Sequence, residues 1–572
     1  MCFYRPPTAM TYDEQIDAAQ AALQQGNFEL SEQLYHEILQ ESPENVPALD
    51  GLGVLFCQKD ETKKGIALFE QALYLLRKET HKNPQWEASI LFHLGLSYRT
   101  LGFRHEALRV FAESATLVPP DHDLVLNLGQ VHFELEQYPQ AAEQFRILTT
   151  LQTDDASAWL TLGFILSNMD QYDEAAKVLR TAETLDSTSP DINFYLAESL
   201  RKAERYVESL PYYQRMLQVG AEYPQAIHGY GKSLLALGKL EDGWDAMEFR
   251  FISSLGTWER HNLENWVPDT VADHVLAYSE EGIGAELMFA SCLPDLINSV
   301  DHCVVECESS LHSLFRRSFP RADFVPLADD YVRPDGNPWE IPLNAQIAFG
   351  SLPRYFRRGI DDFPLRKAYL VPDKELVDKW HTRLAGLGDA KKIGILWNGT
   401  WTNETPKQTS LPLPELQSLI TRHQGGTWIN LQHGSSQNAL NQQRGIGIAP
   451  RMFPEAFKYD LDAMAALLVA LDLVITPPGY VAHLAGALGV KTWLLVPEWA
   501  DWRHSIDVSQ SRSVWHPSIK MYRQAKGQTW QNFFTTLGDD LEKFLTTHRP
   551  PEEMSATLTF TQRKTMAVPK AA

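Results

Sequence analysis

The feature that most constrains the fold is a regular recurrence of small residues. A bulky residue is followed by glycine or alanine at steps of 34 residues, at Leu94-Gly95, Leu128-Gly129, Leu162-Gly163, Leu196-Ala197 and Tyr230-Gly231. Leu52-Gly53 lies one such step plus eight residues before Gly95, and Ala19 lies 34 residues further upstream. A fixed period of this length is typical of chains built from stacked helical hairpins.

A second small residue recurs twelve residues after the first, where the second helix of a hairpin must approach the first closely. The residues at this position are Ser31, Gly65, Ala107, Ala141, Ala175, Ser209 and Gly243. The pattern resembles the tetratricopeptide repeat (TPR) and predicts about seven units over residues 11–252. One unit cannot bury its apolar face alone, so we expect a stacked α-solenoid whose groove holds a protein or peptide.

Most of the negative charge belongs to these repeats. Residues 11–250 contain 37 acidic and 19 basic side chains, whereas the rest of the chain is nearly neutral. An acidic surface repels nucleic acid and anionic membranes. The longest apolar stretch, around Ala463 to Ile475, is interrupted by Asp472 and is too short to span a bilayer. We therefore expect a cytoplasmic protein with no nucleic-acid partner and no membrane span.

The remainder of the chain alternates short apolar runs with helical patterns. Six runs predict strands: His274–Ser279, Cys303–Glu306, Lys392–Trp397, Trp428–Gln432, Leu471–Thr476 and Thr492–Pro497. Such alternation predicts parallel sheets with crossover helices. Its two sets of strands predict two Rossmann-like lobes, at residues 253–385 and 386–545. Residues 546–572 lack apolar periodicity and are expected to be a disordered tail.

The five cysteines are odd in number and have no paired CxxC spacing, so we expect neither a disulfide framework nor a metal site. A kinase or a dehydrogenase would require a P-loop or a GxGxxG motif after a strand. Neither motif occurs in that context.

Several stretches of the C-terminal region resemble bacterial TPR-fused glycosyltransferases. These stretches are EEGIGAELMFASCLPDL from Glu280, GILWNGTWTNETPKQTSLPL from Gly394, NLQHG from Asn430, LDLVITPPGYVAHLAGALGVKTWLLVP from Leu471, DWR from Asp501 and MYRQ from Met521. The catalytic halves of that family are similar to heptosyltransferases, and the domain plan is similar to O-linked N-acetylglucosamine transferase. The resemblance implies a GT-B fold and an inverting, metal-independent transferase that uses a nucleotide sugar as substrate and needs no cofactor.

The residues themselves predict a donor site after the strand Leu471–Thr476. There the chain turns through Gly479 and Tyr480 into a helix, whose free amides and positive dipole end suit a diphosphate. His483 in that helix is expected either to contact the donor, with a possible catalytic role, or to satisfy a neighbouring carbonyl. Gln432 and His433 follow another strand and are candidates for the same cleft. By resemblance alone, Thr400 and Lys407 contact the donor phosphates.

The sequence departs from this family at important positions. Where relatives have Gly-Leu/Ile-Gly-Asp, with an acid proposed to activate the acceptor, this chain has Ala285 after Gly284. Glu286 is the nearest carboxylate and is a candidate base, although a solvated surface residue is an equally good interpretation. Pro478-Gly479 replaces a pair that carries a hydroxyl donor. Two hypotheses therefore stand: an active glycosyltransferase, and a catalytically degenerate TPR scaffold for protein interaction.

Overall fold

The structure is a computed structural model that describes most of the chain. The described residues are 11–78, 83–219, 223–253, 263–268, 274–280, 282–327, 343–399, 410–432, 451–452, 461–498, 501–507 and 511–547. They form two compact units, Met1–Tyr230 and Gly231–Ala572.

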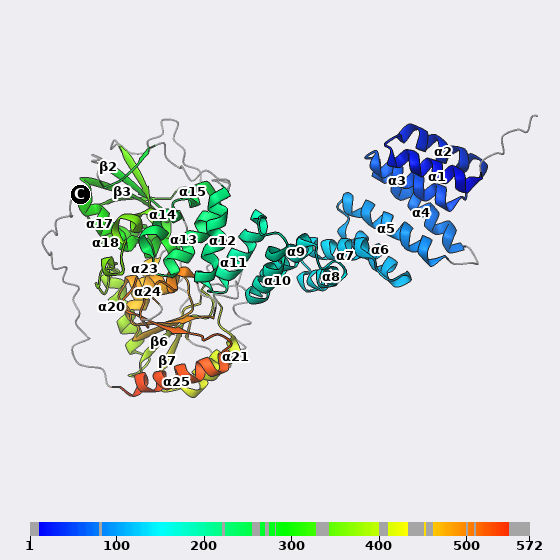
Figure 1. Cartoon of the computed structure of the whole chain (residues 1–572). Coiled ribbons are helices and arrows are strands. Elements are labelled where there is room, and N and C mark those ends of the chain that lie inside the picture. Colours follow the sequence, from blue (N-terminus) through cyan, green and yellow to red (C-terminus); the bar gives the residue numbers. More distant parts are fainter. Residues whose placement is uncertain are drawn as a thin grey trace, which may run out of the picture. The chain divides into compact units, whose positions relative to one another are not determined.

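The first unit is a succession of antiparallel helical hairpins, drawn from blue through cyan to green in Figure 1. Its helices are α1 Tyr12–Gln24, α2 Phe28–Glu41, α3 Val46–Gln58, α4 Thr62–Lys78, α5 Pro84–Thr100, α6 Arg104–Leu117, α7 His122–Glu134, α8 Tyr138–Leu151, α9 Ala156–Asn168, α10 Tyr172–Leu185, α11 Pro190–Lys202 and α12 Tyr206–Val219. Helix α13, Pro224–Ala236, crosses the division between the units. The predicted helical solenoid is confirmed.

The small residues of the period lie where two helices of a hairpin touch. A side chain at Gly53, Gly95 or Gly129 would collide with Phe69, Phe111 or Phe145 of the next helix, respectively. The first helix of each hairpin also begins at a residue that caps its free amides. These N-caps are Thr11, Asn45, Asn83, Asp121, Asp155 and Ser189. Both features are local, which explains why the sequence identified the hairpins.

Each hairpin turn contains a residue with positive φ. Gly26, Gly102 and Gly238 supply it in three turns, whereas Asp60, Glu136, Asp170 and Glu204 supply it in four others. The left-handed conformation is accessible to glycine but unfavourable for other L-residues. The repeats therefore keep one turn geometry even where the residue opposes it.

The second unit begins inside the seventh expected repeat. Its first complete helix is α14, Leu240–Met247, followed by α15, Arg250–Ser253. Trp244 of α14 is 1% exposed, and its ring packs against Trp502 and Trp515. The compact units divide at Tyr230/Gly231, and α14 buries its apolar face against the C-terminal region; a domain boundary near residue 252 stays a prediction.

The first sheet of this unit is parallel, with the order β1-β5-β2-β3-β4. Its strands are β1 Glu264–Asn265, β2 His274–Tyr278, β3 His302–Cys307, β4 Asp323–Pro326 and β5 Ala345–Ala348. Its helices are α16 Ile283–Phe289, α17 Leu293–Ser299, α18 His312–Ser318 and α19 Leu352–Phe356. The sequence predicted β2 and β3 but not β1, β4 or β5.

The second sheet is also parallel, with the order β11-β10-β9-β6-β7-β8. Its strands are β6 Lys392–Ile395, β7 Thr427–Asn430, β8 Arg451–Met452, β9 Leu473–Thr476, β10 Thr492–Val496 and β11 Ile519–Arg523. The accompanying helices are α20 Lys374–Ala385, α21 Leu413–Arg422, α23 Leu461–Val469, α24 Tyr480–Ala487 and α25 Trp530–Thr546. The parallel sheets expected for this region are confirmed.

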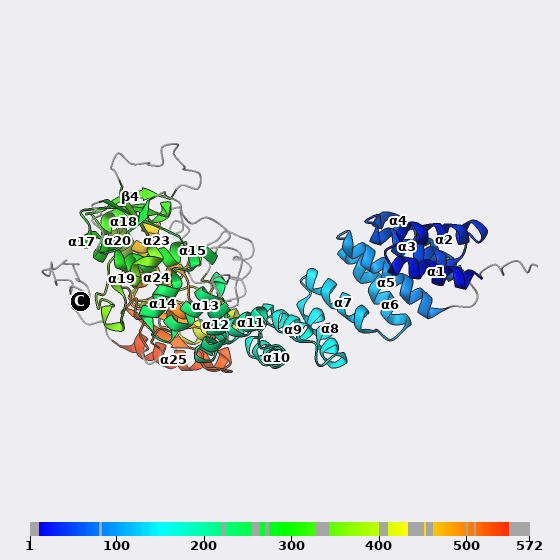
Figure 2. The same cartoon turned by 45° about the horizontal axis from the view of Figure 1, so that its top comes forward.

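Helices cover both faces of the second sheet. On one face, α21 and α25 (α25 is drawn in red in Figure 2) pack on Ile393, Ile475 and Leu495. On the other face Ala482 of α24 packs against Leu494 and Met521 of the sheet. With both faces covered, the strands are almost wholly apolar, as is usual in parallel sheets.

The regions around the two sheets are joined by a linking segment that contains Tyr369 and by an ion pair between two helices. The Tyr369 hydroxyl donates to the Leu287 carbonyl of α16 at 2.5 Å, while the amide of the same residue donates to Ala487 of α24 at 2.9 Å. Arg317 of α18 forms a bidentate ion pair with Asp462 of α23, with both N–O distances 2.8 Å.

Within the described residues, the helices are too short or too polar to cross a membrane.

Candidate functional site

The strand order of the second sheet indicates where its candidate site lies. From β6 the chain adds β7 and β8 on one side, then returns to add β9, β10 and β11 on the other. Loops that leave β6 and β9 at their carboxyl ends therefore turn in opposite directions, which is the topology of a switch point. Ligands of doubly wound sheets bind at such a switch point. The residues after β6 and β9 are the candidates, and they include Gly399, Gly479 and Tyr480.

The two loops touch each other through their backbones. A Cβ atom at Gly399 would collide with the Pro478 carbonyl oxygen, and one at Gly479 would collide with the Gly399 carbonyl oxygen. Glycine is thus required at both positions by close approach of the main chains. The Pro478-Gly479 pair, which departs from the resembled family, fits this contact.

Helix α24 begins directly at this crossing, with Gly479 as its N-cap. All eight of its residues are buried. A side chain at Gly486 would collide with the ring of His516, in the loop before β11. Gly486 therefore makes room for the His516 ring, while Ala482 of the same helix packs against the sheet.

Gln432 supports the loop after β6 rather than projecting freely. Its side-chain oxygen accepts from the Asn398 amide at 3.0 Å, and its side-chain nitrogen donates to the Asn398 carbonyl at 3.4 Å. The side chain is 6% exposed. Gln432 therefore holds the residue next to Gly399 in place. Thr400, Lys407 and His433 lie outside the described residues, as does the tail from residue 548.

His483 lies in the first turn of α24 among other histidines. Its Nδ1 is 3.1 Å from Nε2 of His516, and its ring stacks on His504 with centroids 6.1 Å apart. Burial holds the pKa of His483 well below its usual value, and His516, His504 and Arg503 add to the shift. Burial also lowers the pKa of His504 to about 4 and that of His516 to about 3. The rings are neutral near pH 7, and within the described chain no three metal-binding side chains are placed to hold an ion.

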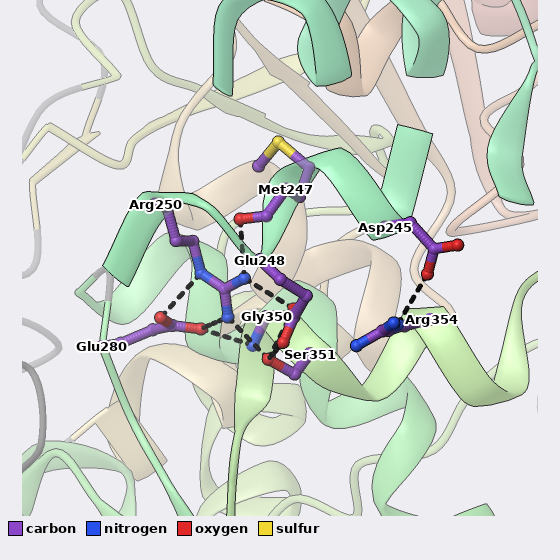
Figure 3. Close-up of polar contacts among 8 residues, drawn as sticks. All are labelled: Asp245, Met247, Glu248, Arg250, Glu280, Gly350, Ser351 and Arg354. Carbon is purple, nitrogen blue, oxygen red and sulfur yellow. Dashed lines mark hydrogen bonds and ion pairs between the residues drawn. The ribbon is translucent and has the colours of Figure 1, made fainter. Parts of the chain in front are cut away.

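At the switch point of the first sheet, Arg250 lies between the segments that follow β2 and β5 and bonds to Glu280 and Ser351 (Figure 3). Its guanidinium donates to both carboxylate oxygens of Glu280 at 2.9 and 2.7 Å and to Ser351 Oγ at 2.8 Å. It also donates to Glu248 at 2.9 Å and to the Met247 carbonyl at 3.0 Å. All five of its N–H groups are used.

The loops of the first sheet close around this arginine. Glu280, at the end of β2, also accepts from the Gly350 amide after β5 at 2.7 Å. Ser351 donates to Glu248 at 2.8 Å (Figure 3). The sequence reasoning missed Arg250 and Glu280, although a charged residue at the end of a buried strand, as at Glu280, was an available signal.

Glu286 lies inside the first sheet's layer. It is 1% exposed, accepts from Ser279 Oγ at 2.7 Å, and accepts from the Glu308 amide at 3.1 Å. Burial raises its pKa to about 8, against the opposing effect of these hydrogen bonds. The interpretation of Glu286 as a solvated surface residue is therefore wrong. Its hydrogen bonds tie together the ends of β2 and β3, and its role as a base stays a prediction.

Ala285 is partly exposed, and its neighbour Gly284 approaches the second sheet's helix. An added Cβ at Gly284 would lie 3.7 Å from the Tyr480 backbone at the start of α24. The turn in which Ala285 replaces the acid of the resembled family thus lies beside the candidate donor site. A separate surface groove of about 480 Å³ lies between α21 and α25, on a face of the sheet rather than at its strand ends.

Comparisons with known proteins each cover only part of this chain. Protein FlbA of Caulobacter vibrioides is 28% identical over 317 residues, which are 52% of this chain and 52% of FlbA, so the match spans about half of that relative. Among solved structures, YrrB, a TPR protein with an unusual peptide-binding site, covers 34% of this chain and 96% of its own at 20% identity and a TM-score of 0.31. MamA from Desulfovibrio magneticus RS-1 covers 30% and 94% at 14% identity, with a TM-score of 0.28.

A comparison with protein families matches the tetratricopeptide repeat at residues 16–80, 92–158 and 160–227. These ranges overlap the helices from α1 to α12 and reach the start of α13. The N-terminal part of this chain consists of tetratricopeptide repeats.

Proposed function

We propose that the C-terminal unit binds a nucleotide sugar at the switch point of its second sheet, within a GT-B architecture, and that the repeats bind a protein or glycan acceptor. The observation that most supports this function is the meeting of Gly399 and Gly479 in front of α24. Two bare backbones there leave amides near a helix N-terminus, the kind of surface that receives a diphosphate.

The proposed reaction is an inverting, metal-independent transfer. An acceptor hydroxyl oxygen forms a bond to the anomeric carbon, the nucleoside diphosphate leaves with the electrons of the broken bond, and a base takes the hydroxyl proton. Thr400 and Lys407 remain proposed phosphate contacts. Glu286, the candidate base, is 1% exposed, and Ala285 carries no carboxylate.

A second candidate function follows from this deficit. A positioned base contributes about 10²- to 10⁴-fold in rate. Without one, the protein would bind a donor but transfer its sugar slowly, which favours a scaffold or sensor of nucleotide sugars. The buried Glu286 beside the unsubstituted Ala285 is the observation in favour of this alternative.

Titration calorimetry with UDP, GDP and their sugar conjugates tests donor binding. Single-turnover assays would then compare wild type with Ala285→Asp, using a donor that binds and peptides selected on the repeats. We expect measurable binding, slow transfer by wild type and faster transfer by Ala285→Asp. Failure of every nucleotide to bind would reject the proposed function, whereas vigorous wild-type transfer would reject the scaffold alternative.

A further inference from the structure

We infer that His516 fixes the proton of His483 on Nε2, so that His483 acts as a neutral hydrogen-bond donor to a nucleoside diphosphate and not as a base. The inference rests on the proposed function for its ligand. It rests on the two rings alone for the position of the proton.

The argument begins with the unpaired nitrogen of His516. This residue is 1% exposed, and its Nδ1 is buried with no hydrogen-bond partner. Its other nitrogen, Nε2, lies 3.1 Å from Nδ1 of His483. A neutral imidazole carries one proton, on one nitrogen or the other. The proton of His516 is therefore either on the isolated Nδ1 or in the bond to His483.

The environment decides between these positions. A proton on Nδ1 would leave a buried N–H without an acceptor, which is rare in folded proteins because the lost hydrogen bond is costly. An Nδ1 lone pair that accepts no hydrogen bond costs less free energy than an unpaired N–H. The ring of His516 stacks on Tyr369, at 6.1 Å between centroids, and packs against Gly486. His516 therefore donates from Nε2 to His483.

The consequence for His483 is direct. Its Nδ1 accepts the bond, so the single proton of the neutral ring is on Nε2. Burial and the nearby His504 and Arg503 keep the ring from taking a second proton. Because Nδ1 faces His516, Nε2 points away from that ring, and within the described part of the chain no residue forms a hydrogen bond with it. His483 is 7% exposed in the first turn of α24, beside the proposed diphosphate site.

This arrangement suits a ligand oxygen that accepts a hydrogen bond. Phosphate oxygens are acceptors only, and the amides at the start of α24 favour the same ligand. A base would require a free lone pair, and here both nitrogens are committed. His516 is thus a positioning residue that acts through His483, and the catalytic role considered for His483 is replaced by a binding role.

The experiment uses the full chain labelled with ¹³C and ¹⁵N in histidine. The Cδ2 and ring-nitrogen shifts distinguish the two neutral tautomers, and loss of a signal in His483→Gln assigns its resonance. We expect the Nε2–H tautomer in wild type. His516→Phe keeps a ring against Gly486 but removes the donor, so His483 should lose its single tautomer, whereas the amide of His516→Gln should restore it.

Calorimetry with UDP and GDP on the same proteins tests the role of the proton. We expect His516→Phe to weaken binding by about tenfold, the effect of one misdirected hydrogen bond, and His516→Gln to recover most of the affinity. An Nδ1–H tautomer in wild-type His483, or equal affinities in all three proteins, would overturn the inference while leaving the proposed function intact. An Nε2–H tautomer with no nucleotide binding would instead reject the proposed function and the ligand role together.

Discussion

At the scale of single residues, the candidate site depends on the absence of side chains as much as on their presence. A methyl group on Gly399 would strike the Pro478 carbonyl, and one on Gly479 would strike the Gly399 backbone. Gln432 fixes the same loop by accepting a hydrogen bond from the Asn398 amide. These contacts define the crossing on which both the proposed donor site and the start of α24 depend.

Gly479→Ala should therefore reduce nucleoside diphosphate affinity by more than tenfold, because the loops must separate to admit the methyl group. Gly425→Ala is the matched control, since a Cβ there meets only Leu545, at an ordinary 4.0 Å. Calorimetry on both variants is the measurement. Unchanged affinity in Gly479→Ala would show that the site lies elsewhere.

Glu286 makes stability depend on pH. The folded carboxyl keeps its proton up to about pH 8, while an unfolded glutamate releases it near 4.5, so the folded state binds more protons between these values. The stabilisation is complete below pH 4.5 and is lost as pH rises through 8. Glu286→Gln, which cannot ionise, should therefore have a larger free energy of unfolding than wild type at pH 8.5, by on the order of 5 kcal/mol, and should unfold at a higher temperature.

Thermal unfolding at pH 5 and at pH 8.5 measures this difference. At pH 5 the two proteins should have nearly equal midpoints, because wild-type Glu286 is then protonated as well. A constant gap between them at both pH values would mean that Glu286 is ionised in the folded protein.

At the scale of elements, the hairpins of the first unit share one turn. Glu136, between α7 and α8, occupies the left-handed conformation at φ 58° and is exposed. Glu136→Gly should stabilise the repeats by about 0.5 to 1 kcal/mol, because glycine adopts this conformation without strain. Glu143→Gly, at an exposed position inside α8, should destabilise them by about 1 kcal/mol. Denaturant unfolding followed by circular dichroism compares the two, and effects of the same sign would contradict the argument.

In the first sheet, a buried ion-pair network centred on Arg250 holds together the segments that follow β2 and β5. Removing one partner of such a network leaves uncompensated buried charge, so Arg250→Ala should destabilise the C-terminal unit by about 3 to 5 kcal/mol. Arg358 forms an exposed pair with Glu241 on the same unit, and Arg358→Ala should change stability by less than about 1 kcal/mol. Tryptophan fluorescence during urea unfolding distinguishes them, and a small effect at Arg250 would show that water replaces the guanidinium.

At the scale of the whole molecule, the two compact units should respond to ligands separately. A nucleotide that binds the second sheet at 100 times its dissociation constant stabilises the folded C-terminal unit by about 2.7 kcal/mol. Calorimetric scanning with UDP should thus raise the transition of residues 231–572 and leave that of the repeats unchanged. A shift of the repeat transition instead would place the nucleotide in the first unit.

Some features could be predicted from the sequence because they are local and periodic. The 34-residue spacing, the caps at hairpin starts and the apolar runs of β2, β3, β6, β7, β9 and β10 each depend on neighbours within one or two elements. Strands β1, β4, β5, β8 and β11 were missed, since they are short or lie at positions where pairing with another strand, rather than their own pattern, makes them strands.

The tertiary structure alone decided what depends on residues far apart in the sequence. It placed Arg250 against Glu280 and Ser351, brought Gly399 to Gly479, and set His516 beside His483. It also turned Glu286 inward, where one residue's difference in a helical turn separates a buried carboxyl from the partly exposed Ala285. Periodicity records which face of an element is buried, but the partner that meets that face is determined by the packing of the whole unit.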